Sequence, residues 1–169
     1  MIDFVKARRN MVDCQVRPSD VTDHAVLAAF DKVERERFLP DEAKPIAYLD
    51  RQLPVGGGRV LLAPMVLARL VQALQPRKTE KAVDLACGLG YSTALLAELT
   101  ESVVGVETSQ ALANEAQARL SAQGVANAKV IVKNGSLRGW KTAIQHFTAG
   151  SIIVEDVHAY QSTGIQFDL

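Results

Sequence analysis

The chain has 169 residues, of which 48% are hydrophobic and 22% charged, as expected for one globular domain with a hydrophobic core. Its 19 basic residues balance its 19 acidic ones, so net charge gives no attraction to nucleic acid or to an anionic membrane. No apolar run is long enough to cross a bilayer, and the N-terminus lacks the apolar segment of a secretory signal, so we expect a cytoplasmic protein.

Residues 1–75 are predicted to form a helical leader. Pro18 ends the first of its helices, because the residue before a proline is disfavoured in helical conformation. Prolines and the run Gly56-Gly57-Gly58 predict a loop over residues 38–60, and these glycines serve either as a hinge over a substrate or as a turn. The helices expected in the leader are residues 3–16 with Asp3 in the first turn, a second helix with Ser19 or Thr22 as N-cap, and residues 64–74.

Residues 76–169 alternate between short apolar runs and helical segments. This alternation is typical of a parallel sheet with right-handed crossovers. The fold class is therefore α/β, and we expect a Rossmann-like core that forms one compact domain with the helical leader. The expected strands are residues 81–86, 102–107, 129–133 and 151–155, and the expected helices are residues 91–99 and 109–123.

The segment VDLACGLGYSTALLAEL is the part of the chain that indicates a ligand. Gly88 and Gly90 allow a tight turn and a close approach of a ligand to the backbone. Glu107, at the end of the next predicted strand, is placed to accept hydrogen bonds from the ribose hydroxyls of a nucleoside. Asp84 would repel a pyrophosphate but attract the cationic methionine end of S-adenosylmethionine. We therefore predict an S-adenosylmethionine site, with Tyr91 at the start of the helix among its residues.

Other ligand classes fit this segment less well. Thr93 stands where a dinucleotide-binding loop prefers glycine or alanine, and the chain has no Gly-x-x-x-x-Gly-Lys-Ser/Thr run for a nucleoside triphosphate. The cysteines and histidines are not spaced for a metal ion or a nucleophile. A purely structural alternative is that the glycines only turn the chain, Asp84 caps the helix and Glu107 is a solvated strand end. The combination of all these residues in strand–loop–helix–strand order favours the ligand.

Beyond this loop, the chain resembles the protein-L-isoaspartate O-methyltransferase family over roughly residues 10–140. The likeness includes MVDCQVRPSDVTDHAVLAAFDKVERERFLP and AYLDRQLPVGGGRVLLAPMVLARLVQAL as well as the core through VVGVE. Such enzymes transfer a methyl group from S-adenosylmethionine to the abnormal carboxylate of isoaspartyl residues in damaged proteins. The resemblance implies that Asp84 and the loop glycines hold the methionine moiety, that Glu107 holds the ribose, and that residues 55–65 form the wall between cofactor and peptide.

Two positions depart from the pattern of this family. The family carries a serine in the motif Ile-Ser-x-Pro, and Leu62 takes its place when the motif is aligned on Pro64. Leucine cannot hydrogen-bond a substrate, but methyl transfer depends more on alignment than on an acid or base, so we assign no catalytic residue. After the third strand, where the family places an aspartate near the adenine amino group, Asn134 either accepts that hydrogen bond or is a turn residue.

The family continues past the fourth predicted strand, whereas this sequence stops at Leu169. We therefore expect a shortened or divergent C-terminal part, with the fourth strand at an edge of the sheet. Isoaspartyl peptides are the expected partners, rather than nucleic acid or a membrane. Two alternatives stay open: a methyltransferase with another substrate, since Leu62 makes the wall more apolar, and a non-catalytic protein that binds S-adenosylmethionine.

Overall fold

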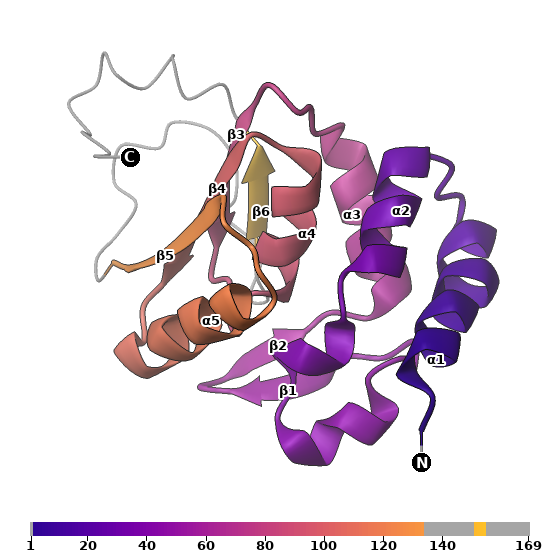
Figure 1. Cartoon of the computed structure of the whole chain (residues 1–169), viewed down its shortest axis with the longest axis horizontal. Helices are drawn as coiled ribbons and strands as arrows, with labels where there is room; N and C mark the ends of the chain where they lie inside the picture. The colour runs from indigo at the N-terminus through magenta and orange to yellow at the C-terminus, as the bar shows by residue number, and fades with distance from the viewer. Residues whose placement is uncertain (1, 134–150, 155–169) are drawn as a thin grey trace.

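The computed structural model of the protein describes residues 2–133 and 151–154. Within these residues, a four-stranded sheet lies beside a group of helices formed by the N-terminal part of the chain (Figure 1). The N-terminal helices pack against the helix that follows the first strand of this sheet. This arrangement is the α/β fold with a helical leader that the sequence predicts.

The first helix of the leader, α1, spans Phe4–Met11 and ends earlier than predicted. Asp3 is its N-cap, and the carboxylate accepts a 3.0 Å hydrogen bond from the backbone N–H of Lys6. The chain then continues as a π-helical turn over Val12–Val16 and a 3-10 turn over Arg17–Ser19. The proline in this last turn lacks a backbone N–H, which is tolerated at the start of a helical turn but not inside an α-helix.

The second helix, α2, spans His24–Lys32 and begins after Asp23. The Asp23 carboxylate accepts hydrogen bonds from two backbone N–H groups of the first turn. The predicted N-caps, Ser19 and Thr22, are therefore wrong. The Ser19 hydroxyl instead donates to the carbonyl of Gln15 at 2.6 Å, because this residue still belongs to the preceding turn. Aspartate is as good an N-cap as serine or threonine, and Asp23 is the cap because it directly precedes the first residue of the helix.

The segment predicted as a loop contains regular structure, so that prediction is wrong. Short 3-10 helices span Arg35–Phe38 and Asp41–Ile46. An antiparallel hairpin follows, with strand β1 at Leu53–Gly56 and strand β2 at Arg59–Leu61. Gly56, Gly57 and Gly58 have φ angles of 92°, 57° and 73°, in the left-handed region that favours glycine, and they make its turn. The strands are too short to produce a recognisable alternation of polar and apolar residues. Helix α3 spans Pro64–Leu74, as predicted.

The parallel part of the sheet follows the predicted alternation of strands and helices. Its strand order is β5-β4-β3, and a helix connects each of these strands to the next along the chain, which is the order of a Rossmann-type half. The strands are β3 at Lys81–Leu85, β4 at Ser102–Glu107 and β5 at Ala128–Val132, and the helices are α4 at Tyr91–Leu99 and α5 at Gln110–Ala122.

The last strand, β6 at Ser151–Val154, lies at the edge of the sheet next to β3. The edge position agrees with the prediction, but the direction does not. This strand is antiparallel to β3, with Ile153 opposite Val83. A run of apolar β-branched residues indicates a buried strand of either direction, because only the pairing with its neighbour distinguishes the two.

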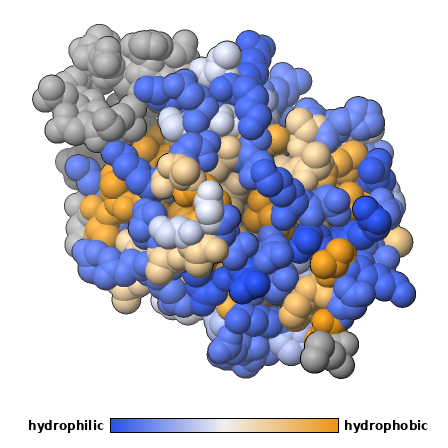
Figure 2. Space-filling model, viewed as in Figure 1, coloured by the Kyte–Doolittle hydropathy of each residue, from blue (hydrophilic) through white to orange (hydrophobic). Residues whose placement is uncertain are grey.

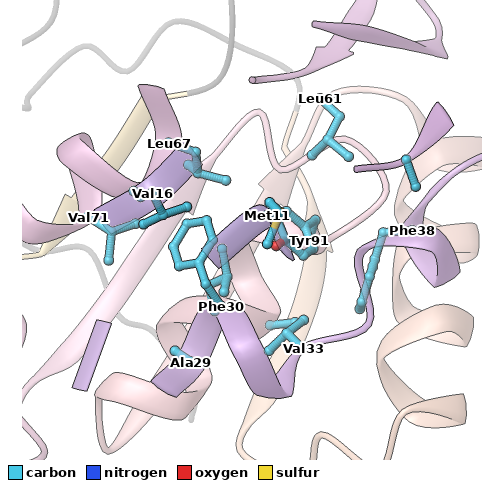
Figure 3. Close-up of a cluster of buried hydrophobic side chains, with 14 of the residues drawn as sticks. Met11, Val16, Ala29, Phe30, Val33, Phe38, Leu61, Leu67, Val71 and Tyr91 are labelled. Carbon is cyan, nitrogen blue, oxygen red and sulfur yellow. The ribbon is translucent and has the colours of Figure 1, made fainter. Parts of the chain in front are cut away.

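One buried cluster of apolar side chains joins the leader to the sheet (Figure 3). Phe30 and Phe38 of the leader meet the ring of Tyr91 on α4, with centroids 6.3 Å and 5.7 Å away. Met11 and Leu67 belong to the same cluster. The leader is therefore packed on the helix that follows the glycine loop, and it positions the hairpin beside that loop.

The visible face of the protein is mostly hydrophilic, with apolar side chains gathered in small separate areas (Figure 2). The larger apolar residues that are exposed include Val5 and Leu49, which are 67% and 49% exposed. Among the residues that the structure describes, no helix combines the length and the apolar character needed to cross a membrane.

Candidate functional site

The glycine loop between β3 and α4 is held by the end of β4. Ala86, Gly88 and Gly90 all have positive φ angles, of 57°, 58° and 92°, so the chain turns sharply over very few residues. The backbone N–H of Gly88 donates a 3.0 Å hydrogen bond to the carboxylate of Glu107. A Cβ at Gly88 would lie 3.6 Å from a methyl group of Val55, so the hairpin passes directly over the loop.

Asp84 lies under the start of α4 and is buried. Its Oδ2 atom accepts hydrogen bonds from the hydroxyls of Ser92 and Thr93, at 2.6 Å and 2.7 Å. Burial raises the pKa of Asp84 to about 6, and the nearby carboxylate of Glu107 adds to this rise while the two hydroxyls oppose it. The donors to this carboxylate are two side-chain hydroxyls, and not the backbone N–H groups at the start of α4. The carboxylate is thus a poorly compensated anion beside the loop, which suits a cationic ligand group.

Glu107 ends β4 with its side chain fully buried. Its two oxygens accept hydrogen bonds from the backbone of Gly88 and Thr108, from the Thr108 hydroxyl and from Arg59. Burial opposes ionisation of this carboxyl, but these donors and the Arg59 charge outweigh it and hold the pKa of Glu107 below its ordinary value. The residue is therefore an ionised acceptor that faces the glycine loop, and not the solvated strand end of the structural alternative.

A pocket lies where the hairpin and the glycine loop meet. Val60, Leu61 and Leu62 line it on the hairpin side, and Ala86, Gly88 and Ser92 are among its residues on the other. The hairpin side belongs to the predicted wall segment. A buried arginine of the leader, Arg35, donates to the carbonyl of Leu62 at 2.8 Å and so fixes the wall from behind. The wall of the pocket is apolar, and Ser92 contributes a hydroxyl on the opposite side.

The sequence model of the family described as Protein-L-isoaspartate(D-aspartate) O-methyltransferase (PCMT) matches residues 7–149. This chain belongs to that family. The protein-L-isoaspartate O-methyltransferase 1 of Rhodopseudomonas palustris is 39% identical over 137 residues, which cover 81% of this chain and 56% of the relative. The enzyme of Methanoculleus marisnigri is 36% identical over 131 residues, which cover 78% and 60%. The chain thus spans less than two thirds of the length of these relatives.

Solved structures of the family confirm the Rossmann-like fold. A protein-L-isoaspartate O-methyltransferase superposes with a TM-score of 0.68 and 20% identity, over 76% of this chain and 42% of the other. A Plasmodium falciparum protein described as a member of the same family, in complex with S-adenosyl-L-homocysteine, superposes with a TM-score of 0.60 and 21% identity. That match covers 79% of this chain and 64% of the other.

The structure gathers most of the predicted site residues of this family member around one loop. Glu107 accepts a hydrogen bond from Gly88, and Asp84 ends the strand before the loop and lies near enough to Glu107 for the two charges to interact, as the order of strands and loop predicts. Tyr91 is among the residues that line the pocket, but its ring is buried against Phe30 and Phe38 in the cluster of the leader. Asn134 lies outside the described residues. Within the described part of the chain, no group of acidic, cysteine and histidine side chains could hold a metal ion.

Arg59 is the site residue that sequence reasoning missed. Its guanidinium forms a bidentate ion pair with Glu107, with N–O distances of 2.9 Å and 3.1 Å. The available signal was a single basic residue inside an otherwise apolar wall segment. That signal does not indicate which residue Arg59 pairs with, because Arg59 and Glu107 come together only when the hairpin folds over the loop.

Proposed function

We propose that this protein transfers a methyl group from S-adenosylmethionine to the carboxylate of isoaspartyl residues in peptides or damaged proteins. Family membership supports the class of reaction. The observation that carries the proposal is the buried carboxylate of Glu107, held ionised at the end of β4 and 3.0 Å from the backbone N–H of Gly88. An acceptor in this position suits the two hydroxyls of a ribose.

The side chains around the loop fit S-adenosylmethionine better than a phosphorylated nucleotide. Asp84 and Glu107 place two carboxylates beside a helix N-terminus that would otherwise attract a phosphate. Gly88 and Gly90 form the tight left-handed turn of the loop, and we include the backbone N–H of Tyr91, at the start of the following helix, in the proposed site. Asn134 stays a prediction for the adenine end.

Bound S-adenosylmethionine would supply an electrophilic methyl group on its sulfonium. The residues of this chain would bind and align the reactants, because an ionised carboxylate acceptor needs no general base at neutral pH. Asp84 would hold the cationic amino-acid end, and the apolar wall formed by Val60, Leu61 and Leu62 would exclude water from the reacting atoms. No residue of the described chain is assigned an acid or base role.

Leu62 favours a second candidate, a methyltransferase of the same fold that accepts a different carboxylate. Its side chain packs against the main core, so the wall carries no hydroxyl where the family pattern has one. A third candidate, a protein that binds the cofactor without turnover, stays open for the same reason. The cytoplasmic location and the lack of a nucleic-acid partner stay predictions of the sequence.

Binding of S-adenosylhomocysteine, measured by calorimetry, tests the cofactor site. We expect Glu107→Gln and Asp84→Ala to weaken binding at least tenfold, since each removes a charge-assisted contact. Glu101→Gln is the matched control, because Glu101 is exposed and lies just before the same strand. A folded wild-type protein that binds no S-adenosylhomocysteine would contradict the proposal.

Methyl transfer to an isoaspartyl peptide, compared with the same peptide containing normal aspartate, tests the acceptor. Activity on the isoaspartyl peptide alone supports the proposal, and Leu62→Ser is then expected to raise it. Cofactor binding without either activity would favour the second or third candidate.

A further inference from the structure

Arg59 occupies the oxygens that a ribose would need on Glu107. Its Nε donates to Oε2 at 3.1 Å and its Nη2 donates to Oε1 at 2.9 Å. The backbone N–H groups of Gly88 and Thr108 donate to the same two oxygens, at 3.0 Å and 2.7 Å, and the Thr108 hydroxyl adds a contact at 3.2 Å. A carboxylate offers about four acceptor positions, so these donors leave no capacity for two further hydroxyls.

We infer that Arg59 is a specificity-determining residue, which leaves Glu107 when a nucleoside binds and takes up a carboxylate of the bound ligand instead. The inference rests on the proposed function. The N–H donors of Gly88 and Thr108 belong to the glycine loop and to the end of β4, so they cannot withdraw without rebuilding the backbone. Arg59 is a long side chain that is 24% exposed, and it can withdraw by rotation alone.

The position of Arg59 brings it to the ligand rather than to solvent. Its Cβ lies 3.9 Å from the point that a Cβ on Gly88 would occupy, so its stem crosses the glycine loop. The neighbouring wall residues Val60, Leu61 and Leu62 are apolar and offer no side-chain anion in exchange. A guanidinium that loses one carboxylate is best satisfied by another, because its planar donors match both oxygens.

Two carboxylates of the proposed reaction can fill this role. One belongs to the methionine moiety of the cofactor, and the other is the methyl acceptor itself. Both would lie beside the glycine loop, which the Cβ of Arg59 adjoins at Gly88. Arg59 would thereby make the nucleoside site selective for ligands that carry a carboxylate. A nucleoside without a carboxylate would break the ion pair between Arg59 and Glu107 and offer Arg59 no other anion.

Calorimetric titration of the wild type and Arg59→Gln, with S-adenosylhomocysteine and its decarboxylated analogue, tests the inference. The analogue keeps the nucleoside and the amino group but lacks the carboxylate. In the wild type we expect the analogue to bind at least tenfold more weakly than S-adenosylhomocysteine. In Arg59→Gln the analogue gains affinity, because no guanidinium competes with it for Glu107. The dissociation constants of the two ligands should then differ by no more than about threefold.

If the acceptor provides the carboxylate, both nucleosides gain affinity equally in Arg59→Gln and the KM of the isoaspartyl peptide rises at least tenfold. Arg59→Lys keeps the charge without the planar fork and should lie between the wild type and Arg59→Gln in either assay. Arg51→Gln is the control, because Arg51 is an exposed arginine that lies just before β1 and outside the wall segment, and it should change nothing.

Unchanged affinities together with an unchanged KM in Arg59→Gln would overturn the inference and leave the proposed function standing. The same holds if both nucleosides lose affinity equally and the KM stays the same, because Arg59 would then only support the fold of the site. If neither the wild type nor Arg59→Gln binds S-adenosylhomocysteine, the proposed function fails and the inference fails with it. Thermal unfolding of each variant confirms that the protein tested is folded.

Discussion

The guanidinium of Arg35 lies over the ring of Tyr91, with its central carbon 5.1 Å from the ring centroid, and both side chains are buried. Its Nε donates to the carbonyl of Ala47 at 2.6 Å, and its Nη2 donates to the carbonyl of Leu62 at 2.8 Å. A single buried cation thus connects the leader, the wall of the pocket and the helix that follows the glycine loop. The position of the wall depends on this cation.

Arg35→Met should lower the free energy of unfolding by about 3 kcal/mol, because it removes the donor from the buried Ala47 carbonyl and the part-buried Leu62 carbonyl and also removes the contact with the Tyr91 ring. Urea denaturation followed by circular dichroism measures this change. Arg37→Gln is the control, since Arg37 lies on the same short helix with a side chain that is 60% exposed and should cost less than about 0.5 kcal/mol. Equal losses for the two variants would contradict the role given to Arg35.

Tyr91→Phe should change the free energy of unfolding by less than about 0.5 kcal/mol. The Tyr91 hydroxyl is buried near the Arg35 guanidinium but has no hydrogen bond of normal geometry among the described residues, so its removal takes away little stabilisation. Tyr91→Ala should cost about 4 kcal/mol, because it removes the ring that meets Phe30, Phe38 and Arg35. Denaturant curves of both variants measure the contrast, and a large loss for phenylalanine would show that the hydroxyl has a structural role.

Gly105→Ala should destabilise the protein by roughly 2 kcal/mol. A Cβ at this position, in the middle of β4, would lie 3.1 Å from the Cys87 sulfur and 3.2 Å from the Thr93 hydroxyl, both closer than ordinary packing. In a Cys87→Ala background the same change should cost less, since the nearer atom is gone. Thermal unfolding of the two single variants and the double variant gives the coupling between the sites. Simple additivity would contradict the clash.

The buried carboxyl of Asp84 should make stability depend on pH. Burial raises its pKa from the ordinary 3.8 to about 6, so the folded protein binds more protons than the unfolded chain between these values. Stability due to this group therefore falls as the pH rises from about 4 to about 6 and then stays constant. Asp84→Asn removes the effect while keeping an acceptor for Ser92 and Thr93. Its advantage over the wild type should grow across this window by roughly 3 kcal/mol.

Denaturant titrations of the wild type and Asp84→Asn at pH 4.5, 5.5 and 7.5 measure this difference. An advantage that is the same at all three pH values would mean that Asp84 is not held in a raised-pKa state.

The parts of the fold set by short stretches of sequence were predictable. Helix α4 at Tyr91–Leu99 and strand β4 at Ser102–Glu107 have the predicted bounds, because glycine, proline and apolar spacing act through neighbouring residues. The same local order placed Asp84 and Glu107 at the carboxyl ends of adjacent parallel strands, where they flank the glycine loop.

The sequence by itself thus determined the α/β order, the glycine loop and its two acids, since each depends on backbone preferences within one strand–turn–helix unit. Only the tertiary structure decided the direction of β6, the turn of the Leu53–Leu61 hairpin over the loop, and the pairing of Arg59 with Glu107 across 48 positions of the chain. From the sequence alone, a charged side chain such as Arg59 could pair with any of many oppositely charged residues. The docking of the leader on α4 selects one of them, because it brings the hairpin within hydrogen-bond distance of the buried carboxylate.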